Sequence, residues 1–366
     1  MSDDTVKPRL AFFAETHIGH GAYQATLARA AAQYDDITPT WFLFEAGGGA
    51  GPLQRVASLN WSLSASIKAR GALARIRPKP DALFFHTPVM SLLSVSYMCD
   101  IPTVISTDAT PENLDEMGAS YRHRMAPALV EAIKLGIVRR PYRTARAVVL
   151  WSDWARASAV SRYGVDPAKA FVIPPGVDLE ALAAPERKPR DTTRFLFVGG
   201  DFERKGGALL LRALGSLDLP WHLDAVTRSP IDTSQCVTYH ENVQPNSEAL
   251  YTLFRAADVF VLPTFGDAMP MAIQEAMAAS LPVIATSVGA IAEAVEHGVT
   301  GLLVQPGDVD RLREALRWMA EHPGERAVMG RRGRDTASAR FDAGINAHHV
   351  VTMLRDLALE QVNNVA

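Results

Sequence analysis

Short apolar segments alternate with helical segments along almost the whole chain, and this alternation limits the possible folds more than any other feature. The apolar segments are short and nearly continuous, as in strands that are buried on both faces. In order, they are residues 9–15, 38–44, 82–87, 102–107, 147–152, 170–175, 194–200, 221–226, 258–263, 282–286 and 301–304. Helical patterns such as those of residues 22–34 and 153–164 lie between them. The chain is therefore predicted to form an α/β fold of doubly wound parallel sheets, with helices on both faces.

The length of the chain and one polar stretch divide this series into two domains. A chain of 366 residues is too long for one ordinary core. Residues 183–192 contain two prolines and show neither periodicity, so we interpret them as an interdomain linker. We predict one Rossmann-like domain over residues 1–182 and a second over residues 193–343. Helical patterns continue to the end, and residues 344–366 are expected to form a helix that packs near or on the first domain.

The composition excludes several classes of protein. Apolar residues make up 48% of the chain and charged residues 21%, which argues against a disordered chain. The formal net charge of −3 provides no basic field for a nucleic acid, so no nucleic-acid partner is expected. Cys99 and Cys236 are too few for a disulfide framework, and residues 1–10 lack the apolar core of a secretory signal. We therefore expect a cytoplasmic protein.

One segment of the second half carries most of the chemical information. Residues 261–286, VLPTFGDAMPMAIQEAMAASLPVIAT, end a strand at Pro263 and begin a helix near Pro270. The free amides of a first helical turn and the helix dipole bind anions, and a diphosphate suits such a site. Asp267 precedes the helix, and Glu275, in its second turn, leans back toward the helix start. Two carboxylates here suit the hydroxyls of a ribose and of a sugar. The alternative is that Asp267 caps the helix and Glu275 is solvated.

A second segment places glycines and basic side chains directly after a strand. In residues 194–214, RFLFVGGDFERKGGALLLRAL, the strand runs into Gly199 and Gly200, and Arg204 and Lys205 precede the next helix. Glycine allows the backbone to approach a ligand closely, and adjacent cations can neutralise a diphosphate leaving group as its charge develops. The spacing fits neither a Walker loop nor a dinucleotide fingerprint. The alternative is a glycine turn with two solvated charges.

Together, these two segments resemble the donor domain of the retaining GT-B glycosyltransferases of family 4, the group 1 type. That family has a strand–Gly–basic–Lys-Gly loop and a Glu-x7-Glu element, followed by Ala-Met-Ala and a Pro-Val-Ile-Ala strand. Here the element is DAMPMAIQE, so Asp267 stands where the family usually has Glu, and Gly200 stands where many members have Arg. Residues 287–308 and 171–178 resemble other parts of the pattern. The resemblance implies the GT-B fold, in which two Rossmann-like domains face each other across a cleft.

The resemblance also implies roles for individual residues. Arg204 and Lys205 would hold the donor diphosphate, Glu275 would bind the nucleotide ribose, and Asp267 would contact the transferred sugar. The other residues that it implies for donor binding are Gly19, Gly21, Gly199, Gly200, Ala268, Met269, Pro270 and Met271. No metal and no cofactor are expected, because the two cations and the helix N-terminus would stabilise the leaving group.

In this fold the first domain binds the acceptor, and it offers several polar candidates. Asp108 follows the strand at 102–107 and can accept a proton or orient the attacking hydroxyl, although an Asp in a turn is also ordinary loop chemistry. His17, His20 and His86 are weaker candidates for the acceptor site. The alternative for His17 and His20 is a surface histidine without a role.

The implied activity is the transfer of a sugar, with retention, from a UDP- or GDP-sugar to a hydroxyl group of an acceptor. The acceptor would be a lipid, a lipid-linked sugar or a small molecule. The residues expected to act in catalysis are Asp108, Asp267, Arg204 and Lys205. Two alternatives stay open. One is a sugar-nucleotide epimerase of the same fold, and the other is a non-catalytic protein that binds sugar nucleotides.

Two basic stretches suggest a further partner. Residues 121–146 contain seven Lys or Arg and one acidic residue, and residues 66–80 contain five basic residues and no acid. A basic amphipathic stretch binds anionic membrane surfaces, with each basic residue contributing up to about 1 kcal/mol. The inner face of the cytoplasmic membrane is therefore a candidate partner, and a solvated basic face is the alternative.

Overall fold

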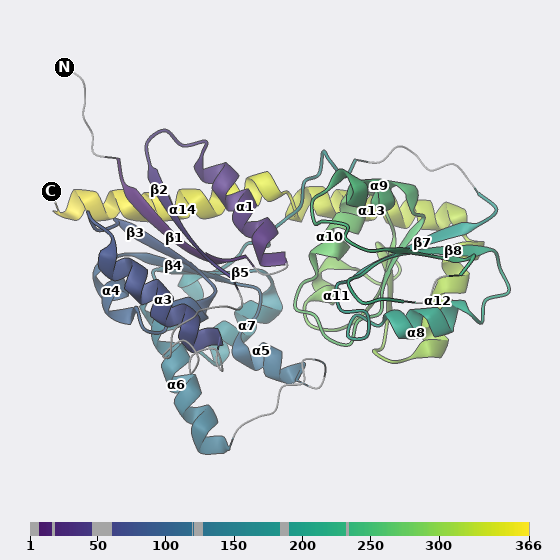
Figure 1. Ribbon diagram of the computed structural model, residues 1–366, viewed down its shortest axis with the longest axis horizontal. Coiled ribbons are helices and arrows are strands. Elements are labelled where there is room, and N and C mark those ends of the chain that lie inside the picture. The colour runs from purple at the N-terminus through teal and green to yellow at the C-terminus, as the bar shows by residue number, and fades with distance from the viewer. Residues whose placement is uncertain are drawn as a thin grey trace. The chain divides into compact units, whose positions relative to one another are not determined.

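The computed structural model describes residues 7–16, 19–45, 61–118, 120, 127–183, 190–231 and 234–365. The chain divides into two compact units (Figure 1). The first unit contains Met1–Glu112, Met125–Pro174 and Gly344–Ala366, and the second contains Asn113–Arg124 and Pro175–Ala343.

The first unit is built on a six-stranded parallel sheet with the strand order β2-β1-β3-β4-β5-β6. The strands are β1 (Arg9–Glu15), β2 (Thr38–Phe44), β3 (Ala82–His86), β4 (Thr103–Thr107), β5 (Ala147–Leu150) and β6 (Ala170–Val172). The α-helices of this unit are α1 (Gly19–Ala31), α3 (Trp61–Arg75), α4 (Val95–Asp100), α6 (Ala128–Thr144), α7 (Asp153–Ser161) and α14 (Ala343–Val365). The short helix α5 (Pro111–Glu116) begins in this unit, and its residues from Asn113 onward are assigned to the second. Short 3₁₀ turns occupy Pro88–Ser91 and Pro167–Lys169.

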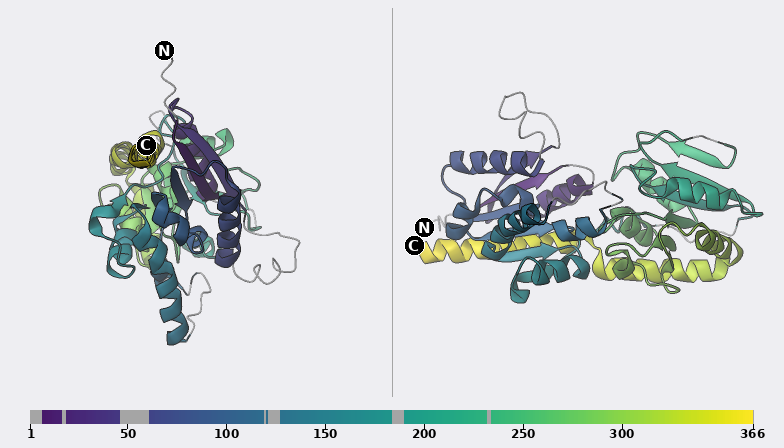
Figure 2. Two further views of the ribbon diagram at one scale, coloured as in Figure 1. Left: turned by 90° about the vertical axis from the view of Figure 1, so that its left-hand side faces the viewer. Right: turned by 90° about the horizontal axis from the view of Figure 1, so that it is seen from below.

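The sheet of the first unit buries both faces because successive strand residues point in opposite directions. Phe13 and Phe85 belong to one core cluster, which α3, α4 and α7 cover. Phe12 and Phe84 belong to the other cluster. The second cluster is closed by residues of α1 and by Ala347, Val350, Val351, Leu354 and Ala358 of α14. The last helix of the chain is therefore part of the core of the first unit, and Figure 2 shows it along that sheet.

The second unit has a six-stranded parallel sheet with the order β12-β11-β10-β7-β8-β9. Its strands are β7 (Thr193–Val198), β8 (Trp221–Val226), β9 (Val237–His240), β10 (Val259–Leu262), β11 (Val283–Thr286) and β12 (Gly301–Val304). Its helices are α8 (Gly207–Leu214), α9 (Glu248–Ala256), α10 (Met271–Ala278), α11 (Ile291–Ala294), α12 (Val309–Glu321) and α13 (Pro323–Arg340). The prediction of two doubly wound parallel sheets is therefore confirmed.

The observed division of the chain differs from the expected one in two places. The first unit ends at Pro174, whereas the expected boundary was residue 182. Asn113–Arg124, which lies within the first half of the sequence, belongs to the second unit. Ser120 contributes to this placement, because its Oγ donates a hydrogen bond to the carbonyl oxygen of Phe265 at 2.6 Å. Of the expected linker 183–192, residues 184–189 lie outside the described residues.

No helix among the described residues is both long enough and apolar enough to span a bilayer.

Candidate functional site

Two loops of the second unit meet at the carboxyl ends of its central strands. β7 and β10 are neighbours in the sheet, so the loop after β7 and the loop after β10 leave the same edge. Lys205 Nζ donates to Asp267 Oδ2, and Arg204 Nη1 donates to the carbonyl oxygen of Gly266 at 2.5 Å. The Lys205 and Asp267 side chains are 14% and 12% exposed. The structure thus joins the two segments that the sequence identified separately.

Arg204 also has a carboxylate neighbour, Asp201, on its own loop. Its Nε lies 3.5 Å from Asp201 Oδ2, and its backbone N–H donates to Asp201 Oδ1 at 3.1 Å. Each of the two predicted cations is therefore paired with one aspartate. This pairing contradicts the alternative of two solvated charges.

Thr264, which was not among the predicted site residues, connects the two loops. Its hydroxyl oxygen accepts the backbone N–H of Gly266 at 3.3 Å and lies 3.3 Å from Asp267 Oδ2. Its carbonyl oxygen accepts the Thr286 hydroxyl at 2.6 Å. Its position in the sequence, directly after the strand-ending Pro263, could have indicated a role at the site. Its effect is to hold Asp267 in a defined position against Lys205.

The glycines of the β7 loop allow this close packing. Gly206 has a φ of +79°, and a Cβ at this position would collide with the carbonyl oxygen of Pro263. A Cβ at Gly199 would lie 2.9 Å from Lys205 Cγ. Gly199 and Gly206 therefore make room for the protein's own side chain and backbone, and not only for a ligand as expected.

Glu275 lies in α10 and is 7% exposed, which contradicts the alternative of a solvated helix residue. Burial raises the pKa of its carboxyl group from 4.5 to about 7. The alternative role for Asp267 is also wrong, because the N-cap of α10 is Pro270 and Asp267 pairs with Lys205. Ala268 and Met269, which lie between Asp267 and Glu275 in the sequence, are buried, and Met271 begins α10.

In the first unit, two of the predicted histidines, His20 and His86, take part in a chain of hydrogen bonds. His86 Nδ1 lies 3.1 Å from the carbonyl oxygen of Ser106. A carbonyl only accepts, so Nδ1 carries the proton and Nε2 is the acceptor. His20 Nδ1 lies 2.6 Å from His86 Nε2 and donates to it. His20 Nε2 then faces Glu15 Oε1 at 3.6 Å. The order of protons along this chain is therefore fixed by one backbone carbonyl.

His86 is fully buried, and burial, followed by the nearby His20, holds the pKa of its imidazole well below the usual range. Trp151 stacks on His86 with ring centroids 5.5 Å apart, and Tyr23 Oη lies 3.1 Å from Ser106 Oγ. Glu15, His20 and His86 are also the described residues that could hold a metal ion, since their ligand atoms lie within 4.8 Å of one another. The hydrogen bond between the histidines occupies His20 Nδ1 and His86 Nε2, and His20 Nε2 is the nitrogen next to Glu15.

Glu15, Tyr23, Ser106 and Trp151 were not among the site residues predicted from the sequence. Their position could have indicated a site, because Glu15 is the last residue of β1 and Trp151 directly follows β5, so both lie at the carboxyl ends of strands. Asp108 lies half-buried after β4 and takes no part in the contacts of this cluster. His17 lies outside the described residues.

Gly19 and Gly21 are in the first turn of α1, so they belong to the helix and not to a loop before it. A Cβ at Gly21 would lie 3.0 Å from the carbonyl oxygen of Thr16. This glycine therefore allows the helix to begin close to the end of β1.

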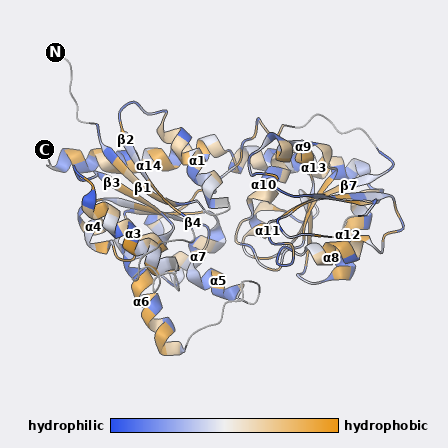
Figure 3. Cartoon of the chain, in the orientation of Figure 1, coloured by the Kyte–Doolittle hydropathy of each residue, from blue (hydrophilic) through white to orange (hydrophobic). Residues whose placement is uncertain are grey.

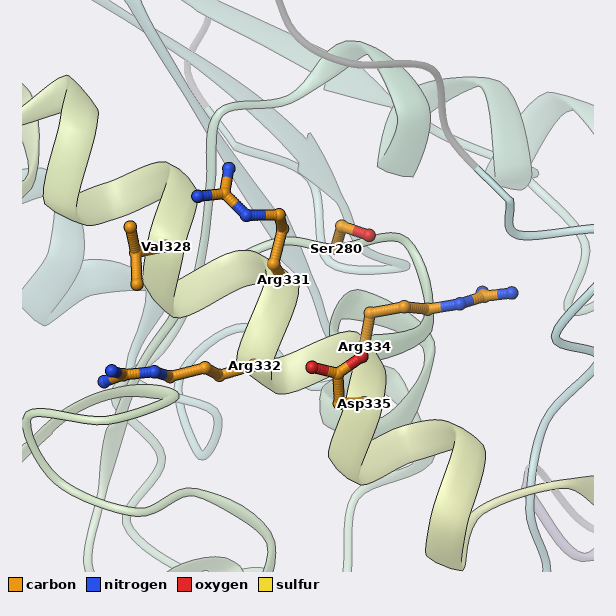
Figure 4. Close-up of a pocket in the computed structure, with 6 residues that line it drawn as sticks. All are labelled: Ser280, Val328, Arg331, Arg332, Arg334 and Asp335. Atoms are coloured by element: carbon orange, nitrogen blue, oxygen red, sulfur yellow. The ribbon is translucent and has the colours of Figure 1, made fainter.

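A surface hollow of about 370 Å³ lies elsewhere in the second unit, along α13 (Figure 4). It is lined by Ser280, Val328, Arg331, Arg332, Arg334 and Asp335. In Figure 4 the Arg334 side chain extends to the side opposite those of Arg331 and Arg332, and Arg334 Nη1 donates to the carbonyl oxygen of Ala278. It therefore lacks the converging donors of an anion site, and it contains none of the predicted residues.

Two family models match this chain and together extend over both units. "Glycosyltransferase Family 4" matches residues 19–181, and "Glycosyl transferases group 1" matches residues 176–322. A D-inositol 3-phosphate glycosyltransferase of Kineococcus radiotolerans is 31% identical over 242 residues, which are 56% of this chain and 55% of that protein. The chain thus spans about half the length of the curated relatives it matches.

Solved structures show the same fold. Sucrose-phosphate synthase of Thermosynechococcus elongatus has a TM-score of 0.77 at 19% identity, covering 96% of this chain and 100% of the other. Anabaena HepE, solved in complex with UDP and glucose, has a TM-score of 0.69 at 16% identity, covering 95% and 100%. These neighbours have the GT-B fold. With the two family models and the motifs quoted above, they show that the chain belongs to the group 1 glycosyltransferases of family 4.

Proposed function

We propose that this protein is a retaining glycosyltransferase that moves a sugar from a nucleotide sugar, a UDP- or GDP-sugar, to a hydroxyl group of an acceptor. The observation that carries the proposal is the junction of the β7 and β10 loops, where Lys205 contacts Asp267 and Arg204 contacts Gly266. The same edge of the sheet leads into α10, which holds Glu275. HepE, with the same fold, binds UDP and glucose, and this favours a uridine nucleotide for the present chain.

In the proposed reaction, a bond forms between the acceptor oxygen and the anomeric carbon on the face from which the nucleoside diphosphate departs. The bond between that carbon and the diphosphate oxygen breaks, and the acceptor proton passes to the leaving phosphate. Arg204, Lys205 and the amides of the first turn of α10 would stabilise the charge that develops on the diphosphate. Asp267 would contact the sugar, Glu275 the ribose, and Asp108 the attacking hydroxyl. This mechanism uses no metal ion.

The test begins with the ligand and continues with the reaction. A nucleoside diphosphate that binds only the folded protein raises its melting temperature, so a thermal-shift screen of UDP, GDP, ADP and their sugars identifies the donor. The best donor is then incubated with D-inositol 3-phosphate, for which the curated relatives are named, and with lipid acceptors in separate reactions. New glycoside with release of nucleoside diphosphate supports the proposal. Isomerisation of the free donor would indicate the epimerase, and binding without either reaction would indicate a binding protein.

We also propose that the first unit rests on an anionic membrane surface through α6. In the described part of the basic stretch, α6 exposes the apolar side chains of Leu129, Ile133 and Ile137, which are 74%, 56% and 47% exposed. Figure 3 shows this apolar colouring along α6, and Lys134, Arg140 and Arg143 are exposed on the same helix. Exposed apolar and basic side chains on one helix suit the interface of an anionic bilayer. Such attachment would bring the acceptor unit to a lipid or lipid-linked hydroxyl at the inner face of the cytoplasmic membrane.

A further inference from the structure

The loop after β8 brings a third cation to the candidate donor site. β8 is the neighbour of β7 on the side away from β10, so its carboxyl end lies at the same edge of the sheet. Arg228 follows this strand and is exposed. A Cβ built on Gly200 would lie 2.9 Å from both Nε and Nη2 of Arg228. The Arg228 guanidinium therefore covers the space into which a side chain at position 200 would extend.

Contacts on both sides of Arg228 fix the position of this loop. The backbone N–H of Gly199 donates to the carbonyl oxygen of Val226 at 2.9 Å. The backbone N–H of Phe202 donates to Ser229 Oγ at 3.4 Å, and that of Ser229 donates to Thr227 Oγ1 at 3.2 Å. The two loops therefore stay side by side, and the placement of Arg228 next to Gly200 does not depend on the arginine side chain alone.

The other two cations of the candidate donor site are already paired with carboxylates, which makes the charge of Arg228 important. Lys205 is paired with Asp267 and Arg204 with Asp201, so these four side chains carry no net charge. A nucleoside diphosphate carries at least two negative charges. Among the ion pairs found in the described residues, none contains Arg228. Arg228 thus adds the unpaired positive charge that a diphosphate at this edge requires.

We infer that Arg228 binds the diphosphate of the donor and replaces, from the neighbouring strand, the arginine that many family members carry at position 200. The inference rests on the proposed function, because it assigns a residue to the same donor site. Guanidinium groups bind phosphate oxygens in a bidentate manner, so the function of the missing side chain can be supplied from a different point of the backbone.

The test measures nucleotide affinity by calorimetry with the full chain. The probes are the tightest-binding of UDP, GDP and ADP, and the nucleoside of the same base, which lacks phosphate. Arg228→Ala is expected to weaken diphosphate binding at least about tenfold and to leave nucleoside binding unchanged. Arg212→Ala, which removes an exposed arginine from α8, is the matched control and should behave as the wild type.

A second variant tests the spatial exchange directly. In Gly200→Arg/Arg228→Ala, the new arginine has the space that Arg228 leaves, and affinity for the diphosphate should return toward the wild-type value. Equal diphosphate affinities for Arg228→Ala and the wild type would overturn the inference while leaving the proposed function intact. So would an equal loss of nucleoside binding, or a double variant as weak as Arg228→Ala. A wild type that binds none of the diphosphates would instead overturn the proposed function, and this inference with it.

Discussion

Replacing Glu275 with Gln should make the ligand-free protein more stable at neutral and alkaline pH. The carboxyl group is 7% exposed, and its burial raises the pKa from 4.5 to about 7. The folded state therefore holds a proton that the unfolded state releases, and stability falls as the pH rises from about 4.5 to about 7. The shift of about 2.5 pKa units corresponds to about 3 kcal/mol at 1.36 kcal/mol per unit. Gln carries no charge, so the variant avoids this loss.

The assay is urea denaturation of both proteins between pH 4 and pH 8.5. The variant and the wild type should be equally stable near pH 4, and the variant should gain up to about 3 kcal/mol above pH 7. Glu321→Gln, at an exposed position of α12, is the control and should leave the pH dependence unchanged. A constant difference between wild type and Glu275→Gln across the whole range would refute the reasoning, because it would mean that burial does not shift this carboxyl group.

The same substitution should fold normally and weaken nucleoside diphosphate binding several-fold, since a carboxylate accepts both ribose hydroxyls and an amide oxygen accepts less well. Equal affinities in calorimetry would contradict the ribose assignment. Wild-type affinity for the donor sugar nucleotide should increase from pH 6 to pH 8 as Glu275 loses its proton, and Glu275→Gln should show no such increase; parallel pH profiles would exclude Glu275 as the cause. Lys205→Ala should lower kcat/KM at least tenfold, about 1.4 kcal/mol of transition-state stabilisation, while Arg212→Ala should not; unchanged kinetics would remove Lys205 from the site. Turnover should survive EDTA, and a loss that Mg²⁺ or Mn²⁺ restores would show that the leaving-group assignment is wrong. The protein should sediment with anionic vesicles at low salt and not at high salt, because salt screens surface charges. Charge reversal at Arg139, Arg140 and Arg143, or Leu129→Asp, should prevent sedimentation without changing nucleotide affinity; a wild type that ignores anionic vesicles at low salt would point to a soluble acceptor.

The sequence was sufficient for most of the fold because the central strands are continuously apolar. The predicted strand at 221–226 coincides with β8, and the one at 301–304 with β12. β9 (Val237–His240) was missed, because it is an edge strand whose residues Thr238 and Tyr239 do not form an apolar run. Edge strands are buried on fewer sides, so their sequence carries less of the signal.

The site was predictable only where it lies within continuous segments. Lys205 and Asp267 could be selected because each belongs to a local motif, and the structure then showed that they touch. The hydrogen bond between His20 and His86 links residues 66 positions apart. Arg228 approaches Gly200 only because β7 and β8 are adjacent in the sheet. Strand order of this kind follows from the packing of the whole unit, so no single segment reveals such neighbours.

The position of α14 determines the order in which the protein can mature during synthesis. The ribosome completes β1 to β6 early, but one face of their sheet is covered by Val350, Val351 and Leu354, which lie more than 170 residues after the end of β6 in the sequence. Until these are synthesised, Phe12 and Phe84 lack part of their apolar cover, and exposed apolar surface of this kind favours aggregation. Most of the second unit, Pro175–Ala343, precedes these residues of α14 in the sequence, so its core can form before the core of the first unit is complete. The first unit therefore begins to be synthesised before the second, but its core can be completed only after the second unit has been made.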